Sequence, residues 1–135
     1  MNSRLVLLFA ALLSFGAVSQ AQTYPSKAVR VVVGFAPGGS TDITARIFAQ
    51  ELNKLWNLQV VVDNRPGASG IIGAELVAKA PPDGYTWLVS PQTSIVVAPL
   101  IFKKVPYDPV RDFATIAVIG STPQPNGPLD NWVEF

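Results

Sequence analysis

The sequence predicts an α/β fold built on a parallel sheet. Three observations indicate it: apolar runs of strand length alternate with helical patterns, the connections are short, and glycine or proline residues mark the junctions. Strands that alternate with helices through short connections are typical of parallel sheets covered by helices. The elements, taken in order, support this interpretation.

The first strand and helix are the clearest pair. Val29–Phe35 is a near-continuous β-branched run, which predicts a strand buried on both faces. Thr41–Leu55 has helical periodicity, with Ser40 as the expected N-cap and Asp42 favoured in the first turn by the helix dipole. The expected buried face of this helix consists of Ile43, Ile47, Phe48, Leu52 and Leu55.

The next elements continue the alternation. Gln59–Asp63 predicts a second short strand, and a loop over Asn64–Gly70 follows it. Ile71–Ala80 predicts a second helix, which the sequence Pro81-Pro82-Asp83-Gly84 ends. The residues expected to pack this helix are Ile72, Leu76 and Val77.

The last predicted elements are shorter. Tyr85–Ser90 predicts a third strand, in which Tyr85, Trp87 and Val89 face away from Thr86, Leu88 and Ser90. Gln92–Leu100 predicts a short helix, and Phe113–Ile119 a fourth strand. Ser121–Phe135 shows no regular pattern and is interpreted as an irregular tail.

The amino terminus has the pattern of a secretory signal. Met1–Arg4 carries one positive charge, Leu5–Val18 is apolar, and Ser19-Gln20-Ala21 supplies small residues. This predicts a signal peptide over residues 1–21, export to the periplasm, and no stable membrane insertion after cleavage. An uncleaved anchor is the alternative, but the run is shorter than the ~20 apolar residues that a spanning helix needs.

Composition argues against several classes of function. The formal net charge is +1 and no basic patch stands out, so we expect no nucleic-acid partner. The chain has neither histidine nor cysteine, which excludes Ser-His-Asp triads, Cys-His pairs and His-ligated zinc. Ser40 as a nucleophile would lack a histidine base. We therefore expect no enzyme activity, no metal and no cofactor.

Segments rich in Gly, Ser or Thr follow the first three predicted strands, at Gly38–Asp42, Arg65–Gly70 and Ser90–Ser94. The carboxyl ends of parallel strands share one edge of a sheet, where ligands commonly bind. A helix that starts there presents free N–H groups and a partial positive charge, which suit an anion. The alternative is a tight turn with a helix cap and no ligand.

Five segments together identify a resemblance. They are Tyr24-Pro25-Ser26-Lys27, Val33–Asp42, Asp63–Ala68, Pro82–Thr86 and Pro106–Phe113. Over about Tyr24–Thr122 the chain resembles the Bug family, the periplasmic substrate-binding proteins of tripartite tricarboxylate transporters. The resemblance implies the first lobe of a type II periplasmic-binding-protein fold, a small carboxylate ligand and membrane transporter subunits as partners.

The resemblance also implies which residues meet the ligand. Gly38, Gly39, Ser40, Thr41 and Asp42 correspond to a first binding loop, and Ala68, Ser69 and Gly70 to a second. Ser90, Gln92, Thr93 and Ser94 correspond by position only. For Arg65, a carboxylate clamp and a turn brace are both open, and the Asn-Arg-Pro-Gly context favours the brace.

Members of the family are considerably longer than this chain. Residues 22–120 are therefore expected to form a partial first lobe, truncated before the second. One hypothesis is a truncated solute-binding protein that captures small carboxylates for the transporter. The alternative is a degenerate fragment without ligand binding, which self-associates through an open sheet edge.

Overall fold

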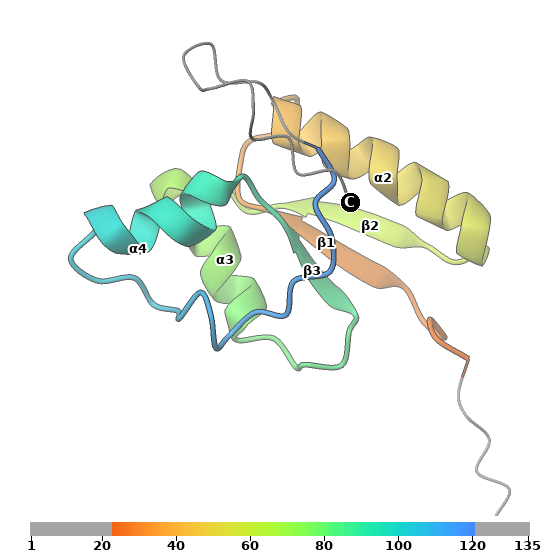
Figure 1. The fold of residues 1–135 in the computed structure, drawn as a ribbon. Helices are drawn as coiled ribbons and strands as arrows, with labels where there is room; N and C mark the ends of the chain where they lie inside the picture. The colour runs from red at the N-terminus through yellow and green to blue at the C-terminus, as the bar shows by residue number, and fades with distance from the viewer. Residues whose placement is uncertain (1–22, 121–135) are drawn as a thin grey trace, which may run out of the picture.

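A computed structural model describes residues 23–120 (Figure 1). The predicted signal peptide, residues 1–21, and the predicted tail, residues 121–135, lie outside the described residues. The elements in chain order are β1 (Val29–Val33), α2 (Ser40–Trp56), β2 (Val60–Asn64), η1 (Ala68–Gly70), α3 (Ile71–Ala78), β3 (Thr86–Val89), η2 (Thr93–Val97) and α4 (Ala98–Ile101).

The three strands form one parallel sheet in the order β2-β1-β3. In the middle of β1, Val31 lies between Val62 of β2 and Trp87 of β3. Val31, Val32 and Val33 have no exposed surface, because β1 has a strand on each side and helices over both faces. The predicted α/β class with a parallel sheet is confirmed.

Helices cover the sheet in two layers (Figure 1). On one face, α2 packs over Val29, Val31 and Val33 of β1. On the other face, α3 and α4 form a second apolar cluster that includes Leu88 of β3. The predicted alternation of the third strand is confirmed, because Trp87 packs with the first cluster and Leu88 with the second.

Of the predicted buried face of α2, Leu52 is confirmed and Phe48 is half-buried, whereas Ile43, Ile47 and Leu55 are wrong. Ile47 is 58% exposed and Leu55 75% exposed, and Ile43 is also exposed. The helix instead packs through Asp42, Ala45, Ala49, Leu52 and Trp56. The buried Asp42 is bonded to Asn64 of β2, and Ala45 and Ala49, three and seven positions further on, lie on the same side of the helix and face the sheet. Small alanines then let the helix lie close to the valines of β1.

The packing of α3 also differs from the prediction. Its buried residues are Ile71, Gly73 and Ala74, whereas Ile72 is exposed and lies against Gly67. The reason is a close helix–strand contact: a Cβ on Gly73 would come within 2.8 Å of the Gly34 Cα atom. The small residues of α3 therefore face the sheet, which rotates Ile72 outwards.

The predicted fourth strand is absent. Residues 113–120 form no strand in the described structure, and Ile116 and Val118 are 67% and 76% exposed. This segment runs beside β3 (Figure 1), but a hollow of about 620 Å³ is lined by both of them. A strand exists only when its backbone groups pair with a neighbour. Within the described residues β3 pairs only with β1, so residues 113–120 have no strand partner.

The remaining helical prediction, Gln92–Leu100, is confirmed in outline. It appears as two consecutive pieces, the wide turn η2 and the short helix α4, which has a proline in its first turn. Within residues 23–120, no helix combines the length and the apolar character needed to span a membrane.

Candidate functional site

The three predicted binding segments begin where β1, β2 and β3 end. Since the strands are parallel, these ends lie on the same edge of the sheet. The turn before α2 follows β1, η1 follows β2, and the η2 segment follows β3. The topology therefore brings together the segments that contain all the predicted site residues, although their contact with a ligand stays a prediction.

The turn between β1 and α2 presents backbone donors. Gly38 has φ +86°, a left-handed conformation that glycine adopts without strain, and its N–H is bonded to Asp42. The N–H groups of the next four residues, Gly39 to Asp42, have no acceptor within residues 23–120, and the helix ladder begins at Ile43. Gly39 and Ser40 are exposed, so these donors border solvent.

The predicted N-cap, Ser40, is wrong. Gly39 occupies the cap position in an extended conformation, and Ser40 is already helical. The side chain that bonds back across the turn is Asp42, whose Oδ2 accepts the N–H of Gly38 at 2.8 Å. A carboxylate in the third helical position commonly satisfies a backbone N–H near the helix start in this way. The serine hydroxyl is therefore not needed as a cap.

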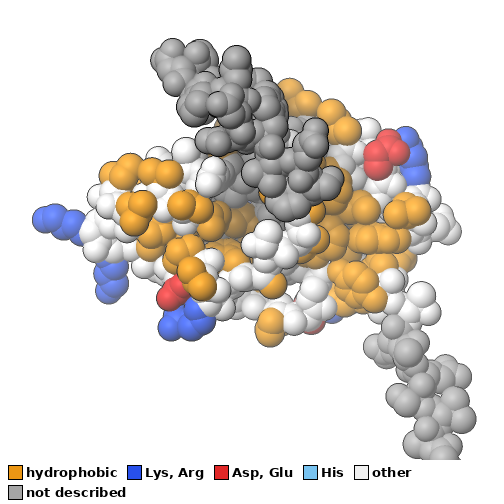
Figure 2. Space-filling model, in the orientation of Figure 1, with side chains coloured by type: hydrophobic (Ala, Val, Ile, Leu, Met, Phe, Trp, Pro, Cys, Tyr) orange, Lys and Arg blue, Asp and Glu red, His pale blue; other side chains and the backbone are white. Residues whose placement is uncertain are grey.

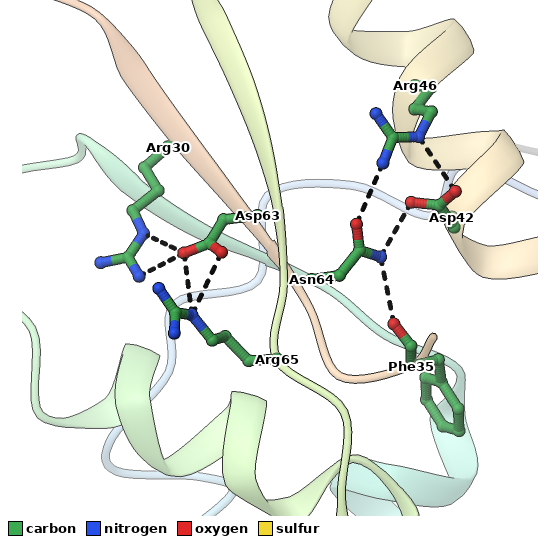
Figure 3. A network of polar contacts seen from close by, with 7 residues as sticks. All are labelled: Arg30, Phe35, Asp42, Arg46, Asp63, Asn64 and Arg65. Carbon is green, nitrogen blue, oxygen red and sulfur yellow. Dashed lines mark hydrogen bonds and ion pairs between the residues drawn. The ribbon is translucent and has the colours of Figure 1, made fainter. Parts of the chain in front are cut away.

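Asp42 is the centre of a polar network (Figure 3). It is 2% exposed, and it accepts hydrogen bonds from Arg46 Nε at 2.9 Å and from Asn64 Nδ2 at 2.8 Å. Arg46 Nη2 donates to Asn64 Oδ1 at 3.0 Å, and Asn64 Nδ2 also donates to the carbonyl of Phe35 at 3.0 Å. The network thus joins the start of α2 to the ends of β1 and β2.

The network favours the ionised form of Asp42. Hydrogen bonds from Arg46, from the backbone of Gly38 and from Asn64 outweigh the effect of burial and lower the pKa of Asp42 to about 2. In turn, the hydrogen bond to Asp42 raises the pKa of Arg46. At neutral pH, Asp42 and Arg46 therefore form an ion pair.

The segment after β2 contains a strained turn. Ala68 and Ser69 have φ +47° and +56°, in the left-handed region that non-glycine residues rarely adopt, and Gly70 follows with φ +90°. Such strain is found most often at binding and active sites. Ala68 and Ser69 are exposed, and their N–H groups have no acceptor in the described part of the chain. These two N–H groups lie at the same edge of the sheet as those before α2.

Three glycines, Gly34, Gly70 and Gly73, allow η1 to pack closely against the end of β1. A Cβ on Gly34 would lie 2.8 Å from the Gly70 Cα atom, and one on Gly70 would lie 2.6 Å from Ser94 Oγ. Together with Gly73, these glycines allow the backbones of β1, η1 and α3 to touch. Gly70, one of the predicted ligand residues, is buried in this contact and positions Ala68 and Ser69 of η1.

The polar residues that follow β3 lie in different environments. Ser94 is fully buried and donates to the carbonyl of Ser69 at 2.8 Å, while Tyr107 donates to the carbonyl of Ser94. Thr93 is exposed. Ser90 donates to the carbonyl of Pro91 at 3.2 Å and lines the hollow beside β3. This segment therefore supports η1 through Ser94.

Arg65 braces the loop, which confirms the favoured interpretation. Its Nε lies 3.1 Å from Asp63, and Arg30 pairs with the same carboxylate (Figure 3). Burial acts to raise the pKa of Asp63, but the hydrogen bonds from Arg30 and Arg65 leave it below its usual value. Arg30 and the Nε of Arg65 are thus engaged by a carboxylate, whereas the backbone N–H groups described above have no acceptor within residues 23–120.

Two supporting residues, Arg46 and Asn64, were not predicted as site residues from the sequence, and Ser94, which corresponds by position to the third segment, has a supporting role. One signal for Arg46 is its position four residues after Asp42, which favours an ion pair on a helix. Asn64 acts through a contact between distant segments, so local sequence carries no comparable signal for its role.

Comparison with known proteins gives consistent matches. Residues 44–125 match the family described as tripartite tricarboxylate transporter family receptor. A UPF0065 protein of Bordetella bronchiseptica is 43% identical over 122 residues, which cover 90% of this chain and 36% of that protein. BugT of Bordetella pertussis is 37% identical over 117 residues, or 86% of this chain and 36% of that protein.

Solved structures agree with the fold. The periplasmic binding protein BugD superimposes with a TM-score of 0.61 and 40% identity, over 67% of this chain and 30% of BugD. MatC of Rhodopseudomonas palustris, solved with bound malate, gives 0.63 and 39%, over 67% of this chain and 31% of MatC. Another R. palustris protein, solved with adipate, gives 0.62 and 40%, over 64% of this chain and 29% of that one. The chain spans about a third of the length of these relatives.

Proposed function

Because the chain belongs to the tripartite tricarboxylate transporter receptor family, we propose that it captures small carboxylates as part of a periplasmic solute-binding receptor. Two of the similar structures were solved with malate and with adipate, which supports a carboxylate as the ligand class. The proposed role is reversible capture for membrane transporter subunits rather than a chemical reaction.

One observation carries this proposal: the row of N–H groups from Gly39 to Asp42 that have no acceptor in the described residues. They lie at the start of α2, where the helix dipole favours negative charge. The N–H groups of Ala68 and Ser69 follow the neighbouring strand. A carboxylate has two oxygens, each able to accept from one of these two segments.

The test removes one backbone donor without removing the turn. Ser40→Pro deletes the N–H at the first helical position, which tolerates proline well, and the extended Gly39 before it is compatible with a following proline. Ser40→Ala, which deletes the hydroxyl alone, is the matched control. Calorimetric titration with malate, adipate and citrate should show roughly a ten- to hundredfold weaker affinity for Ser40→Pro than for Ser40→Ala.

Equal affinities of these two variants would contradict the role of the backbone donors. Circular dichroism of both variants checks that α2 is intact.

Export belongs to the same proposal. Residues 1–21 have the pattern of a cleaved signal peptide, and the function requires the periplasm. When the full chain is expressed in a bacterium, periplasmic extracts should contain a protein that begins at Gln22, as measured by mass spectrometry. A chain that keeps residues 1–21 and stays in the membrane fraction would contradict it.

A second candidate function is self-association, and the open edge of β3 favours it. Within the described residues, β3 pairs only with β1, and its other edge borders the apolar hollow of about 620 Å³. Thr86–Val89 contains no charge and no proline, the usual features that protect an exposed edge. An extended segment of a second copy can pair with these free backbone groups.

Sedimentation measurements over a range of protein concentrations distinguish the two functions. Self-association through this edge predicts a dimer that Ile116→Lys dissociates, because Ile116 lines the hollow and a lysine there opposes strand insertion. Val110→Lys is the matched control, since Val110 is exposed but is not among the residues that line the hollow. A monomer at all concentrations excludes this candidate.

A further inference from the structure

The proposed anion site contains a negative charge of its own. Asp42 contributes one of the free N–H groups at the start of α2, and its carboxylate lies against the same turn, 2.8 Å from the N–H of Gly38. A carboxylate near the helix N-terminus opposes the partial positive charge that would attract an anion. An uncompensated Asp42 would therefore repel the ligand that the turn is suited to bind.

Arg46 compensates this charge. Its Nε lies 2.9 Å from Asp42 Oδ2, and its Nη2 donates to Asn64, which in turn donates to Asp42 Oδ1 (Figure 3). The three side chains form a closed triangle of hydrogen bonds. Arg30 and Arg65 are paired with Asp63, so in the described part of the protein Arg46 is the cationic group in contact with Asp42.

We propose that Arg46 determines the preference of this turn for anions without touching the ligand, a role that rests on the proposed function of the site. By holding Asp42 in a neutral pair, Arg46 leaves the N–H groups of Gly39 to Asp42 with a net positive potential. Loss of the guanidinium exposes the buried carboxylate and reverses the local sign. Arg46 is thus a selectivity residue and Asn64 its positioning partner.

A thiol at Ser40 measures the local potential without any ligand. The chain has no cysteine, so Ser40→Cys introduces a single reporter at the first helical position. The positive end of a helix lowers the pKa of a thiol placed there. The pKa is measured from the pH dependence of the reaction with iodoacetamide, in the full chain and with circular dichroism as the check of folding.

Adding Arg46→Gln to Ser40→Cys should raise the pKa of the thiol by about one, as expected for one uncompensated charge a few ångströms away. With Asp42→Asn also present, Arg46→Gln should leave the thiol pKa nearly unchanged, because no carboxylate then needs compensation. Arg46→Lys should keep the low value, since it keeps the charge. A change below about 0.3, or an equal change with and without Asp42, overturns the proposal.

The ligand measurement is independent of the thiol. By calorimetric titration with malate, Arg46→Gln should bind on the order of tenfold more weakly than the unmodified chain. Arg111→Gln, which breaks an exposed Arg–Asp pair, is the matched control and should bind normally. If malate, adipate and citrate do not bind the unmodified chain but the thiol responds as expected, the proposed function fails and the role of Arg46 stands.

Discussion

At the scale of single residues, Asp42 has the largest share in organising the site. Helix electrostatics alone explain an acidic residue in the first turn of α2. The structure adds that the side chain is buried and bonded to Gly38, Arg46 and Asn64. One carboxylate therefore shapes the turn, sets the buried face of the helix and joins the ends of two strands.

Asp42 should make stability depend on pH in acid. Its pKa is about 2 in the folded protein against 3.8 for the unperturbed group, so the folded state holds the ionised form more strongly. The resulting stabilisation is complete above pH 3.8 and is lost as the pH falls towards 2. Urea denaturation at a series of pH values should show a smaller loss of stability over this range for Asp42→Asn.

The control for this experiment is Glu51→Gln, which removes an exposed carboxylate of the same helix. Its stability should change with pH as that of the unmodified chain does. The interpretation fails if Asp42→Asn and Glu51→Gln have the same pH profile.

At the scale of elements, the contact of α2 with the sheet depends on small residues. Ala45 and Ala49 are buried against the valines of β1, whereas the larger Ile43 and Ile47 face solvent. Hydrophobic periodicity counts the large residues, and on this helix it therefore points to the wrong face. The position of Asp42, a polar residue, indicates the buried face better.

This arrangement predicts different responses to leucine at two positions of α2. Ala49→Leu adds volume between α2 and β1 and should destabilise the protein by about 1–3 kcal/mol. Ile47→Leu, at an exposed position two residues earlier on the opposite side of the helix, should change the free energy of unfolding by less than about 0.5 kcal/mol. Equal values from denaturant unfolding would show that Ala49 is not at the interface.

The contact of α3 with β1 makes a similar prediction for a glycine. Gly73→Ala places a Cβ 2.8 Å from the Gly34 Cα atom, which the two backbones can relieve only by separating. We expect a loss of about 1–3 kcal/mol and a displaced η1 loop. Gly39→Ala, whose Cβ would meet only the Ala36 carbonyl at 3.6 Å, is the control. The midpoint of unfolding measures the loss of stability in each variant, and the backbone amide NMR signal of Ser69 reports any displacement of η1.

At the scale of the whole molecule, two features lie at different edges of the fold. The strand ends carry the proposed anion site, and the open side of β3 carries the apolar hollow. Figure 2 shows hydrophobic side chains spread over one face of the molecule, with few charged ones among them. Exposed apolar surface of this extent is typical of contact with other protein segments.

The segment around Tyr24 packs against the end of the fold that lies opposite the proposed site. Tyr24 packs against the rings of Trp56 and Tyr85 and donates to the carbonyl of Gly84 at 2.6 Å. Tyr24→Phe removes only the hydrogen bond and should cost about 1 kcal/mol, because Trp87 still donates to that carbonyl.

Tyr24→Ala also removes the half-exposed ring and should cost about 1 kcal/mol more than Tyr24→Phe. Urea denaturation gives both values. If the two variants have equal stability, the ring contacts contribute nothing and this account of the segment is wrong.

Sequence alone determined the α/β class, the alternation of strands and helices that indicates a parallel sheet, and which segments lie at the strand ends. These follow from local patterns: β-branched runs such as Val29–Val33, glycine turns such as Pro37-Gly38-Gly39, and short connections. Each depends on residues that are close together in the chain, so the pattern is visible without coordinates.

Only the tertiary structure decided which helix faces are buried, that residues 113–119 form no strand, and that Asp42, Arg46 and Asn64 form one unit. These features depend on pairing and packing between segments far apart in the chain. A strand needs a partner within hydrogen-bonding distance, and a buried charge needs its counter-charge. Neither condition is set by the residues next to it in the sequence.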